Sequence, residues 1–118
     1  FDPTLVLIGL AGGKLIEAGR AAGLATAQEF FADRNYMADG ALVPRKQENA
    51  VIADEDFAVA RVVRAVQKGT IEAVDGSTIE VAADTICVHG DNVHALEFAK
   101  KIREALMQAD VELKPYCE

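Results

Sequence analysis

The sequence is short of the features that mark several specialised classes of protein. It contains no Trp and only 3 Pro among 118 residues, while hydrophobic types make up 51% of it. Disordered segments carry much less apolar sequence, so we expect a folded, globular chain. No apolar stretch approaches the roughly 18 residues that a membrane span requires, and the start lacks a basic segment. We therefore expect neither a membrane protein nor a secretory signal.

Positive charge and cysteine are also scarce. Lys and Arg number 12 against 19 Asp and Glu, which leaves a net charge of −7. Because the basic residues are scattered singly, we expect no contact with nucleic acid or an anionic membrane. The two cysteines are Cys87, inside an apolar run, and Cys117, beside the last residue. We expect them to stay unpaired, as suits a cytoplasmic protein.

Alternating apolar runs and amphipathic stretches predict an α/β fold. Short apolar runs are typical of buried strands, and they occur at 4–8, 24–31 and 85–88. Amphipathic stretches predict helices at 14–22, 54–68 and 94–109. Strands that alternate with helices indicate parallel βα units.

The two longer predicted helices have defined ends and apolar faces. Asp54 is a natural N-cap, and Gly69 a natural C-terminal stop. The stripe expected to face the core is Phe57, Val59, Val62, Val63 and Val66 in the first of them. In the last helix it is Ala95, Ala99, Ile102, Leu106 and Ala109.

Two further segments separate these elements. Asp75-Gly76 lies between β-forming residues 70–74 and 77–81, which predicts a hairpin. Its alternation of apolar and polar residues is imperfect, so we expect a peripheral hairpin with one wet side. Residues 33–53 show little periodicity and should form a long, structured loop. Loops of this length in compact domains usually carry function.

Sites in parallel βα folds form where strands end, and three loops meet that condition: 9–14, 33–45 and 89–92. Gly12 and Gly13 lie in the first, where backbone N–H groups can approach an anion. A P-loop would need Gly in place of Ile8 and Ser or Thr in place of Leu15. This turn therefore predicts either an anion contact or a tight connection from strand to helix.

The other two loops hold the candidate side chains. Asp33, Arg34, Tyr36 and Arg45 share the second loop, and either Arg could bind a carboxylate or phosphate through two hydrogen bonds. The alternative is an internal ion pair that fixes the loop.

The third loop contains His89, a candidate general base, metal ligand or hydrogen-bond donor. Asp91 could orient it or could cap the following helix. The sequence has no second cluster of His and carboxylates at ligand spacing, so we predict no metal site.

Two motifs carry a family resemblance. Residues 29–36 and 40–45 read E-F-F-A-D-R-N-Y and G-A-L-V-P-R, and residues 83–91 read A-D-T-I-C-V-H-G-D. In this order they resemble the LamB/YcsF family, described as the A subunit of 5-oxoprolinase. The resemblance implies ATP-dependent cleavage of the lactam 5-oxoproline to L-glutamate, together with subunits B and C. It also implies a distorted (β/α) barrel of the glycoside hydrolase and deacetylase type.

For that reaction we hypothesise that the residues binding substrate or phosphate are Gly12, Gly13, Asp33, Arg34, Tyr36 and Arg45. Arg34, Arg45 and the turn at Gly12 would meet phosphate oxygens, and His89 with Asp91 would activate water. Gly13 stands where the family often has Ser. Whether a divalent metal is required stays open. Two alternatives also remain: a non-catalytic lactam- or carbohydrate-binding regulatory subunit, and a metal-dependent hydrolase like the deacetylases.

The match to the family is partial. Family members are about twice as long, and their N-terminal motifs N-C-D-L-G-E, A-C-G-F-H-A-G-D and G-A-H-P are absent here. The chain also opens on Phe1 rather than Met. We therefore expect residues 1–118 to be a single partial domain, the C-terminal half of a barrel, and inactive alone. Its other half would lie elsewhere in the polypeptide, on another chain, or be replaced by self-association.

Overall fold

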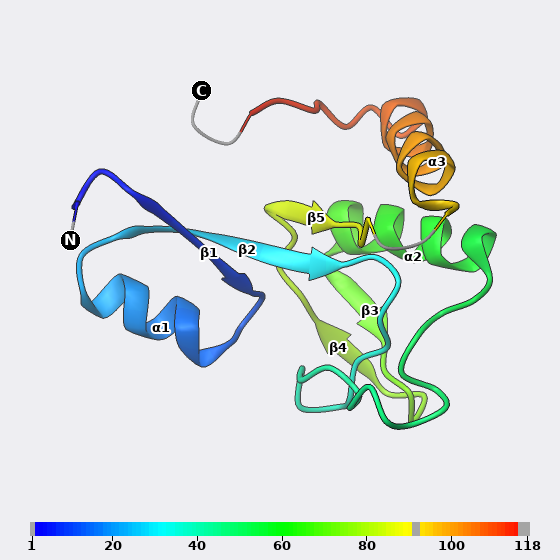
Figure 1. Cartoon of the computed structure of the whole chain (residues 1–118), viewed down its shortest axis with the longest axis horizontal. Helices are drawn as coiled ribbons and strands as arrows, with labels where there is room; N and C mark the ends of the chain where they lie inside the picture. The colour runs from blue at the N-terminus through cyan, green and yellow to red at the C-terminus, as the bar shows by residue number, and fades with distance from the viewer. Residues whose placement is uncertain (1, 91–92, 116–118) are drawn as a thin grey trace.

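The computed structural model describes residues 2–90 and 93–115, which are organised around a three-stranded parallel sheet. Its strands are β1 (Val6–Leu10), β2 (Ala25–Phe31) and β5 (Thr85–Cys87), in the order β1-β2-β5 (Figure 1). The first part of β2 pairs with β1, from Val6↔Ala25 to Leu10↔Glu29. Its last part pairs with β5, from Glu29↔Thr85 to Phe31↔Cys87. The predicted parallel arrangement is confirmed, and the strands end toward the same edge of the sheet.

Helix α1 (Lys14–Ala21) connects β1 to β2 and packs on both strands. Gly12 turns the chain at φ +70°, and Gly13 is the N-cap of α1. Gly19 is the contact point with the sheet, since a Cβ there would collide with Leu7 and lie 3.1 Å from Thr26. The glycine allows the helix axis to approach the strands closely.

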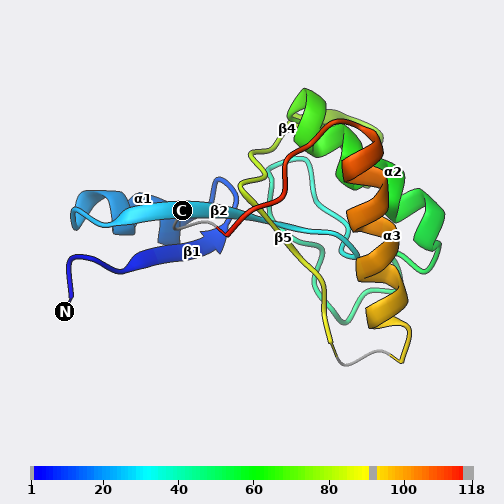
Figure 2. The same ribbon diagram turned by 90° about the horizontal axis from the view of Figure 1, so that it is seen from above.

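Helices α2 (Glu55–Lys68) and α3 (Ala95–Gln108) pack against each other at the β5 end of the molecule (Figures 1 and 2). The predicted ends of α2 are confirmed. The Asp54 carboxylate accepts a hydrogen bond from the Phe57 N–H at 3.2 Å, and Gly69 closes the helix with φ +67°. The cap satisfies an amide that has no partner within the helix.

The predicted buried faces of these helices were partly wrong. The buried residues of α2 are Ala58, Arg61, Val62 and Ala65, whereas Phe57 is 57% exposed. The prediction took the larger apolar residues as the buried stripe and left out the alanines, but small residues spaced along one stripe let a helix pack closely. In α3 the buried residues are Phe98, Ile102 and Leu106, and Ala99 is exposed.

Strands β3 (Thr70–Glu72) and β4 (Thr78–Glu80) form the predicted antiparallel hairpin, with Ile71 opposite Ile79. The hairpin lies outside the parallel sheet and keeps one polar side, as expected. It is less peripheral than predicted, because Ile71 is fully buried and joins the core with Val81. The buried cluster consists of Phe30, Ala32, Tyr36, Ala58, Val62, Ala65, Ile71, Val81, Phe98, Ile102 and Leu106.

Within the described ranges, the sheet has two open edges. Strands β1 and β5 each pair only with β2, so no closed barrel forms from these residues. Apolar side chains near the β1 edge and on α1 are exposed, namely Leu5 (56%), Ile8 (49%) and Leu15 (54%). No helix in the described part of the chain is long and apolar enough to cross a membrane.

Candidate active site

A hydrogen-bonded acid–base pair lies where two neighbouring parallel strands end. Asp33 follows β2, His89 follows β5, and His89 Nδ1 lies 3.0 Å from Asp33 Oδ1 and 3.3 Å from Oδ2. Their side chains are 23% and 26% exposed, respectively, so solvent still reaches them. When Asp33 is ionised, Nδ1–H donates to its carboxylate and Nε2 is left as an acceptor. This arrangement can orient a base and hold the proton that the base accepts.

The imidazole has a second contact. The Phe31 ring meets the His89 ring edge-on, with centroids 5.5 Å apart and an interplanar angle of 73°. Phe31 pairs in register with Cys87, two residues before His89, so the strand pairing brings the two rings together. The aromatic edge and the Asp33 carboxylate together limit rotation of the imidazole.

Sequence reasoning placed Asp33 among the residues that bind substrate or phosphate and chose Asp91 as the carboxylate that orients His89. The structure instead brings Asp33, 56 positions away in sequence, to His89. Asp91 lies outside the described residues, so its assigned role stays a prediction. Only the pairing of β2 with β5 makes Asp33 and His89 neighbours, and a single sequence does not reveal that pairing.

The loop that follows Asp33 is structured, as predicted, and the Arg34 guanidinium is one of its fixed points. Arg34 is 6% exposed, and it donates from Nη2 to the Val43 carbonyl at 2.7 Å and from Nε to that of Ala50 at 3.3 Å. The backbone adds bridges from Arg34 to Val51 and from Tyr36 to Leu42. The guanidinium therefore fixes the loop through backbone carbonyls, where the sequence had offered an ion pair as the alternative to ligand binding.

Tyr36 is placed in the core. It is 1% exposed, stacks on Phe30 with centroids 5.4 Å apart, and its hydroxyl accepts from the Phe31 N–H at 3.0 Å. Burial raises the pKa of the Tyr36 phenol despite that hydrogen bond. Arg45 is exposed on the same loop. Contacts of these residues with a ligand stay predictions.

The glycine turn uses its amides within the chain. Gly12 N–H donates to Gln28 Oε1 at 2.9 Å, and Gly13 N–H donates to the Leu10 carbonyl at 2.9 Å. Gly12 and Gln28 also border a cavity of about 340 Å³ that reaches Gly69 and Glu80. The turn is therefore a tight strand-to-helix connection whose amides are hydrogen-bonded within the chain, and a small cavity lies beside it.

Sequence reasoning missed Arg61 altogether. This residue of α2 is 6% exposed, and its Nη2 donates to the carbonyls of Phe31 and Ala32 at 3.0 Å each and of Arg34 at 2.7 Å. Burial lowers the pKa of Arg61 to about 10, which still leaves it charged at neutral pH. A signal did exist, because Arg61 interrupts the stripe of small residues that α2 buries.

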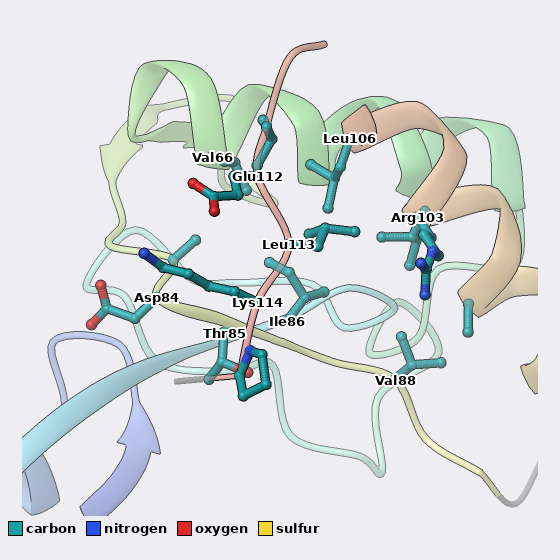
Figure 3. Close-up of a pocket in the computed structure, with 15 residues that line it drawn as sticks. Val66, Asp84, Thr85, Ile86, Val88, Arg103, Leu106, Glu112, Leu113 and Lys114 are labelled. Carbon is teal, nitrogen blue, oxygen red and sulfur yellow. The ribbon is translucent and has the colours of Figure 1, made fainter. Parts of the chain in front are cut away.

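A larger groove of about 570 Å³ lies elsewhere, between β5, α3 and residues 111–115 (Figure 3). Ile86, Leu106 and Leu113 gather near its centre, with Arg103 and Asp84 toward opposite ends. Neither Asp33 nor His89 lines it. This groove is larger than the cavity beside Gly12, but the acid–base pair lies outside it, at the carboxyl ends of β2 and β5.

Two further properties bear on the chemistry near Asp33 and His89: the protonation of the Cys87 thiol and the grouping of metal-ligating side chains. Burial, helped by the nearby Glu29 carboxylate, raises the pKa of the Cys87 thiol to about 11, so the thiol stays protonated at neutral pH. Among residues 2–90 and 93–115, no group of three or more His, Cys, Asp or Glu side chains is placed to hold a metal ion.

The parallel sheet and the Asp33–His89 pair define part of an α/β protein with an acid–base pair at the carboxyl ends of its strands. The sequence model of the LamB/YcsF family matches residues 1–118, and the chain belongs to that family.

Similar proteins agree with this assignment. The chain is 50% identical over 115 residues to the A subunit of 5-oxoprolinase from Bacillus licheniformis, covering 98% of this chain and 46% of the relative. It is 52% identical over 112 residues to the protein of the same name from Alkaliphilus metalliredigens, covering 95% and 44%. A crystal structure of a lactam utilization protein from Thermus thermophilus superposes with a TM-score of 0.87 at 42% identity, covering 97% and 45%. The chain thus spans less than half the length of these proteins.

Proposed function

We propose that this chain is part of the A subunit of a cytoplasmic, ATP-dependent 5-oxoprolinase, which hydrolyses 5-oxoproline to L-glutamate. The observation that carries the proposal is the Asp33–His89 hydrogen bond at 3.0 Å, in a chain about half identical to proteins named as the A subunit of 5-oxoprolinase. Opening a lactam requires water to attack an unstrained amide carbonyl. A positioned base that takes the proton from that water speeds such a step by about 10²–10⁴-fold.

His89 is the proposed base, and Asp33 orients it. The Asp33 carboxylate accepts from Nδ1–H, so His89 Nε2 is the atom that would receive a proton from water. As the imidazole becomes positively charged, the carboxylate stabilises it. The 26% exposure of the His89 side chain leaves a path for water to reach the ring.

Most groups assigned to phosphate binding in the described residues are not available to bind ATP. The Arg34 guanidinium and the amides of Gly12 and Gly13 are used in internal hydrogen bonds, so they form no phosphate cradle. Arg45, which was also assigned to phosphate, has an exposed side chain that a ligand can reach. ATP coupling therefore rests on the family resemblance, and we derive no step through the nucleotide.

The rest of the fold is proposed to come from further chain. Strands β1 and β5 are sheet edges in the described part, and an exposed strand edge invites pairing with another strand. The relatives have more than twice the aligned length, which is enough for additional βα units. We infer that residues 1–118 form the C-terminal half of a barrel, completed by that remaining length, and that it works with subunits B and C.

The test is release of glutamate from 5-oxoproline by the full-length A protein assembled with subunits B and C, with and without ATP. His89→Ala should lower kcat about 10²–10⁴-fold with little change in KM, because it removes the base but not the substrate contacts. Asp33→Asn should lower kcat as well, since an amide can donate to Nδ1 and favour the other tautomer. The matched control is His94→Ala, five residues along and exposed, which should retain wild-type kcat.

Two results would contradict the proposal. Wild-type kcat in His89→Ala would remove His89 as the base. Absence of ATP-dependent glutamate release from the wild-type complex would favour the non-catalytic alternative, a regulatory protein that binds a lactam or carbohydrate.

A further inference from the structure

Arg61 is a buried cation with an unusual set of partners. Its side chain comes from α2 and reaches the end of β2, where Nη2 alone donates to three carbonyl oxygens. No carboxylate lies within ion-pair distance of it in the described residues, and Nε and Nη1 are buried without a hydrogen-bond partner. Burying a charge in this way is unfavourable, so the position calls for a compensating role.

Two aromatic faces supply part of the compensation. The guanidinium carbon lies 4.9 Å from the centroid of Phe30 and 5.6 Å from that of Tyr36. These two rings also stack on each other, so they hold Arg61 from one side. A planar guanidinium can meet ring faces and carbonyl oxygens together, which an ammonium cannot do equally well.

The three carbonyls belong to residues that flank Asp33 in the sequence. They belong to Phe31, Ala32 and Arg34, two on one side of Asp33 and one on the other. The Asp33 carbonyl itself accepts from Ile52 N–H at 2.8 Å. The backbone from which the Asp33 carboxylate projects is therefore fixed at four successive residues, three of them by Arg61.

We propose that Arg61 is a positioning residue that holds the Asp33 carboxylate in hydrogen-bonding distance of His89 Nδ1. This rests on the proposed function, in which that pair is the base and its orienting group. The hydrogen bonds of Arg61 all go to backbone carbonyls, so it acts mainly through the backbone around Asp33, and its charge also attracts the Asp33 carboxylate. Without its guanidinium, three carbonyls lose their donor and the end of β2 is free to shift.

The test measures the NMR signals of the His89 ring nitrogens in the 118-residue chain labelled with ¹⁵N. In a neutral imidazole the protonated and unprotonated ring nitrogens give distinct ¹⁵N signals, so spectra recorded in alkaline buffer report the tautomer. The chain has two histidines, so His94 serves as the reference in every spectrum. In the wild-type chain we expect Nδ1–H to be the major His89 tautomer.

In Arg61→Met we expect that tautomer to become the minor form while the His94 signals stay unchanged. The matched control is Arg64→Met, one turn further along α2, which loses a single hydrogen bond to Thr70 Oγ1 at 3.3 Å. It should leave the His89 tautomer as in the wild type. Arg61→Lys keeps the charge without the planar fork, and we expect a smaller change in the same direction.

A folded Arg61→Met chain with the wild-type His89 tautomer would overturn the proposal. If that variant does not fold, Arg61→Lys decides, because unchanged His89 signals in it would overturn the proposal equally. The readout needs no turnover, so it is independent of the glutamate assay. Loss of activity in His89→Ala with no effect of Arg61 on the tautomer would leave the proposed function standing without this residue.

Discussion

The two ends of the molecule differ in where their largest buried side chains lie. The N-terminal unit, residues 2–27, consists of β1, α1 and the start of β2, and it leaves Leu5, Ile8 and Leu15 about half exposed. The C-terminal body, residues 28–115 where described, places Phe30, Ile71 and Val62 at 0% exposure. The body also leaves large apolar side chains exposed, such as Phe57 (57%) and Leu96 (68%). It nevertheless supplies five of the six largest fully buried side chains, and the N-terminal unit supplies the sixth, Ile16.

That difference separates two roles. The body carries the Asp33–His89 pair, the buried Arg61 and the fixed loop, all of which need a rigid surrounding. The N-terminal unit has one helix on its sheet and an open strand edge. Since the relatives have more than twice the aligned length, the proposed further chain would pack on this exposed surface.

Phe30→Ala should produce the largest loss of stability. Phe30 is fully buried, stacks on Tyr36 and supports the Arg61 guanidinium, so its removal leaves a cavity and weakens both contacts. We expect the free energy of unfolding in urea to fall by about 3–5 kcal/mol. The control is Leu15→Ala in the N-terminal unit, 54% exposed, which should change it by less than about 0.5 kcal/mol. Equal losses in the two variants would contradict the contrast between the two ends.

Cys87 is expected to have a smaller effect on the free energy of unfolding, and this effect depends on pH. Its folded pKa is raised to about 11 from an ordinary value of 9.0, because burial in β5 disfavours the thiolate. The unfolded chain therefore loses this proton first. The stabilisation is complete below pH 9 and is lost as pH rises toward 11.

The measurement compares the unfolding free energy of wild type and Cys87→Ala from about pH 8 to about pH 11. The advantage of the wild type should shrink across this window by less than about 1 kcal/mol, since the thiol is only partly buried. Groups that titrate in alkali without interacting with Cys87 are common to both chains and cancel. Tyr36 is the exception, because the Cys87 thiolate helps to raise the pKa of its phenol, so the comparison reports both groups. A constant difference across the window would contradict the raised pKa.

Local sequence signals predicted the elements well. The Asp54 cap, the Gly69 stop and the Asp75-Gly76 turn act through backbone groups a few residues away, so one segment suffices to recognise them. The buried faces were predicted less well. Phe57 was predicted to be buried as part of an apolar stripe, but small Ala58 and Ala65 face the core because helices pack closely there.

The candidate site was predicted residue by residue but not as a set. Asp33 and His89 were both singled out, yet their contact spans 56 positions and depends on β2 pairing with β5. Arg34 was assigned to a ligand because arginine favours anions, and its carbonyl partners, Val43 and Ala50, become visible only when the loop is folded. Arg61 was missed because a charged residue on a helix is ordinarily assigned to solvent.

The same substitution at two isoleucines gives the sharpest comparison, and the smallest predicted effect is the one at Ile8. Ile8 in β1 is 49% exposed, whereas Ile71 in β3 is fully buried, and Thr preserves β-branching at both. In this chain Ile8→Thr should change the unfolding free energy by less than about 0.5 kcal/mol. Ile71→Thr should lower it by about 2–4 kcal/mol, because a hydroxyl would replace packed carbon in the core.

Repeating the pair in a polypeptide with the full length of the relatives tests what covers β1. If further chain packs on this strand, Ile8 becomes buried there and Ile8→Thr should become as costly as Ile71→Thr. If Ile8→Thr is costly in the 118-residue chain already, the open edge of β1 is covered by the chain itself or by a second copy. If it stays neutral at full length, the exposed apolar residues of the N-terminal unit serve some purpose other than completing the fold.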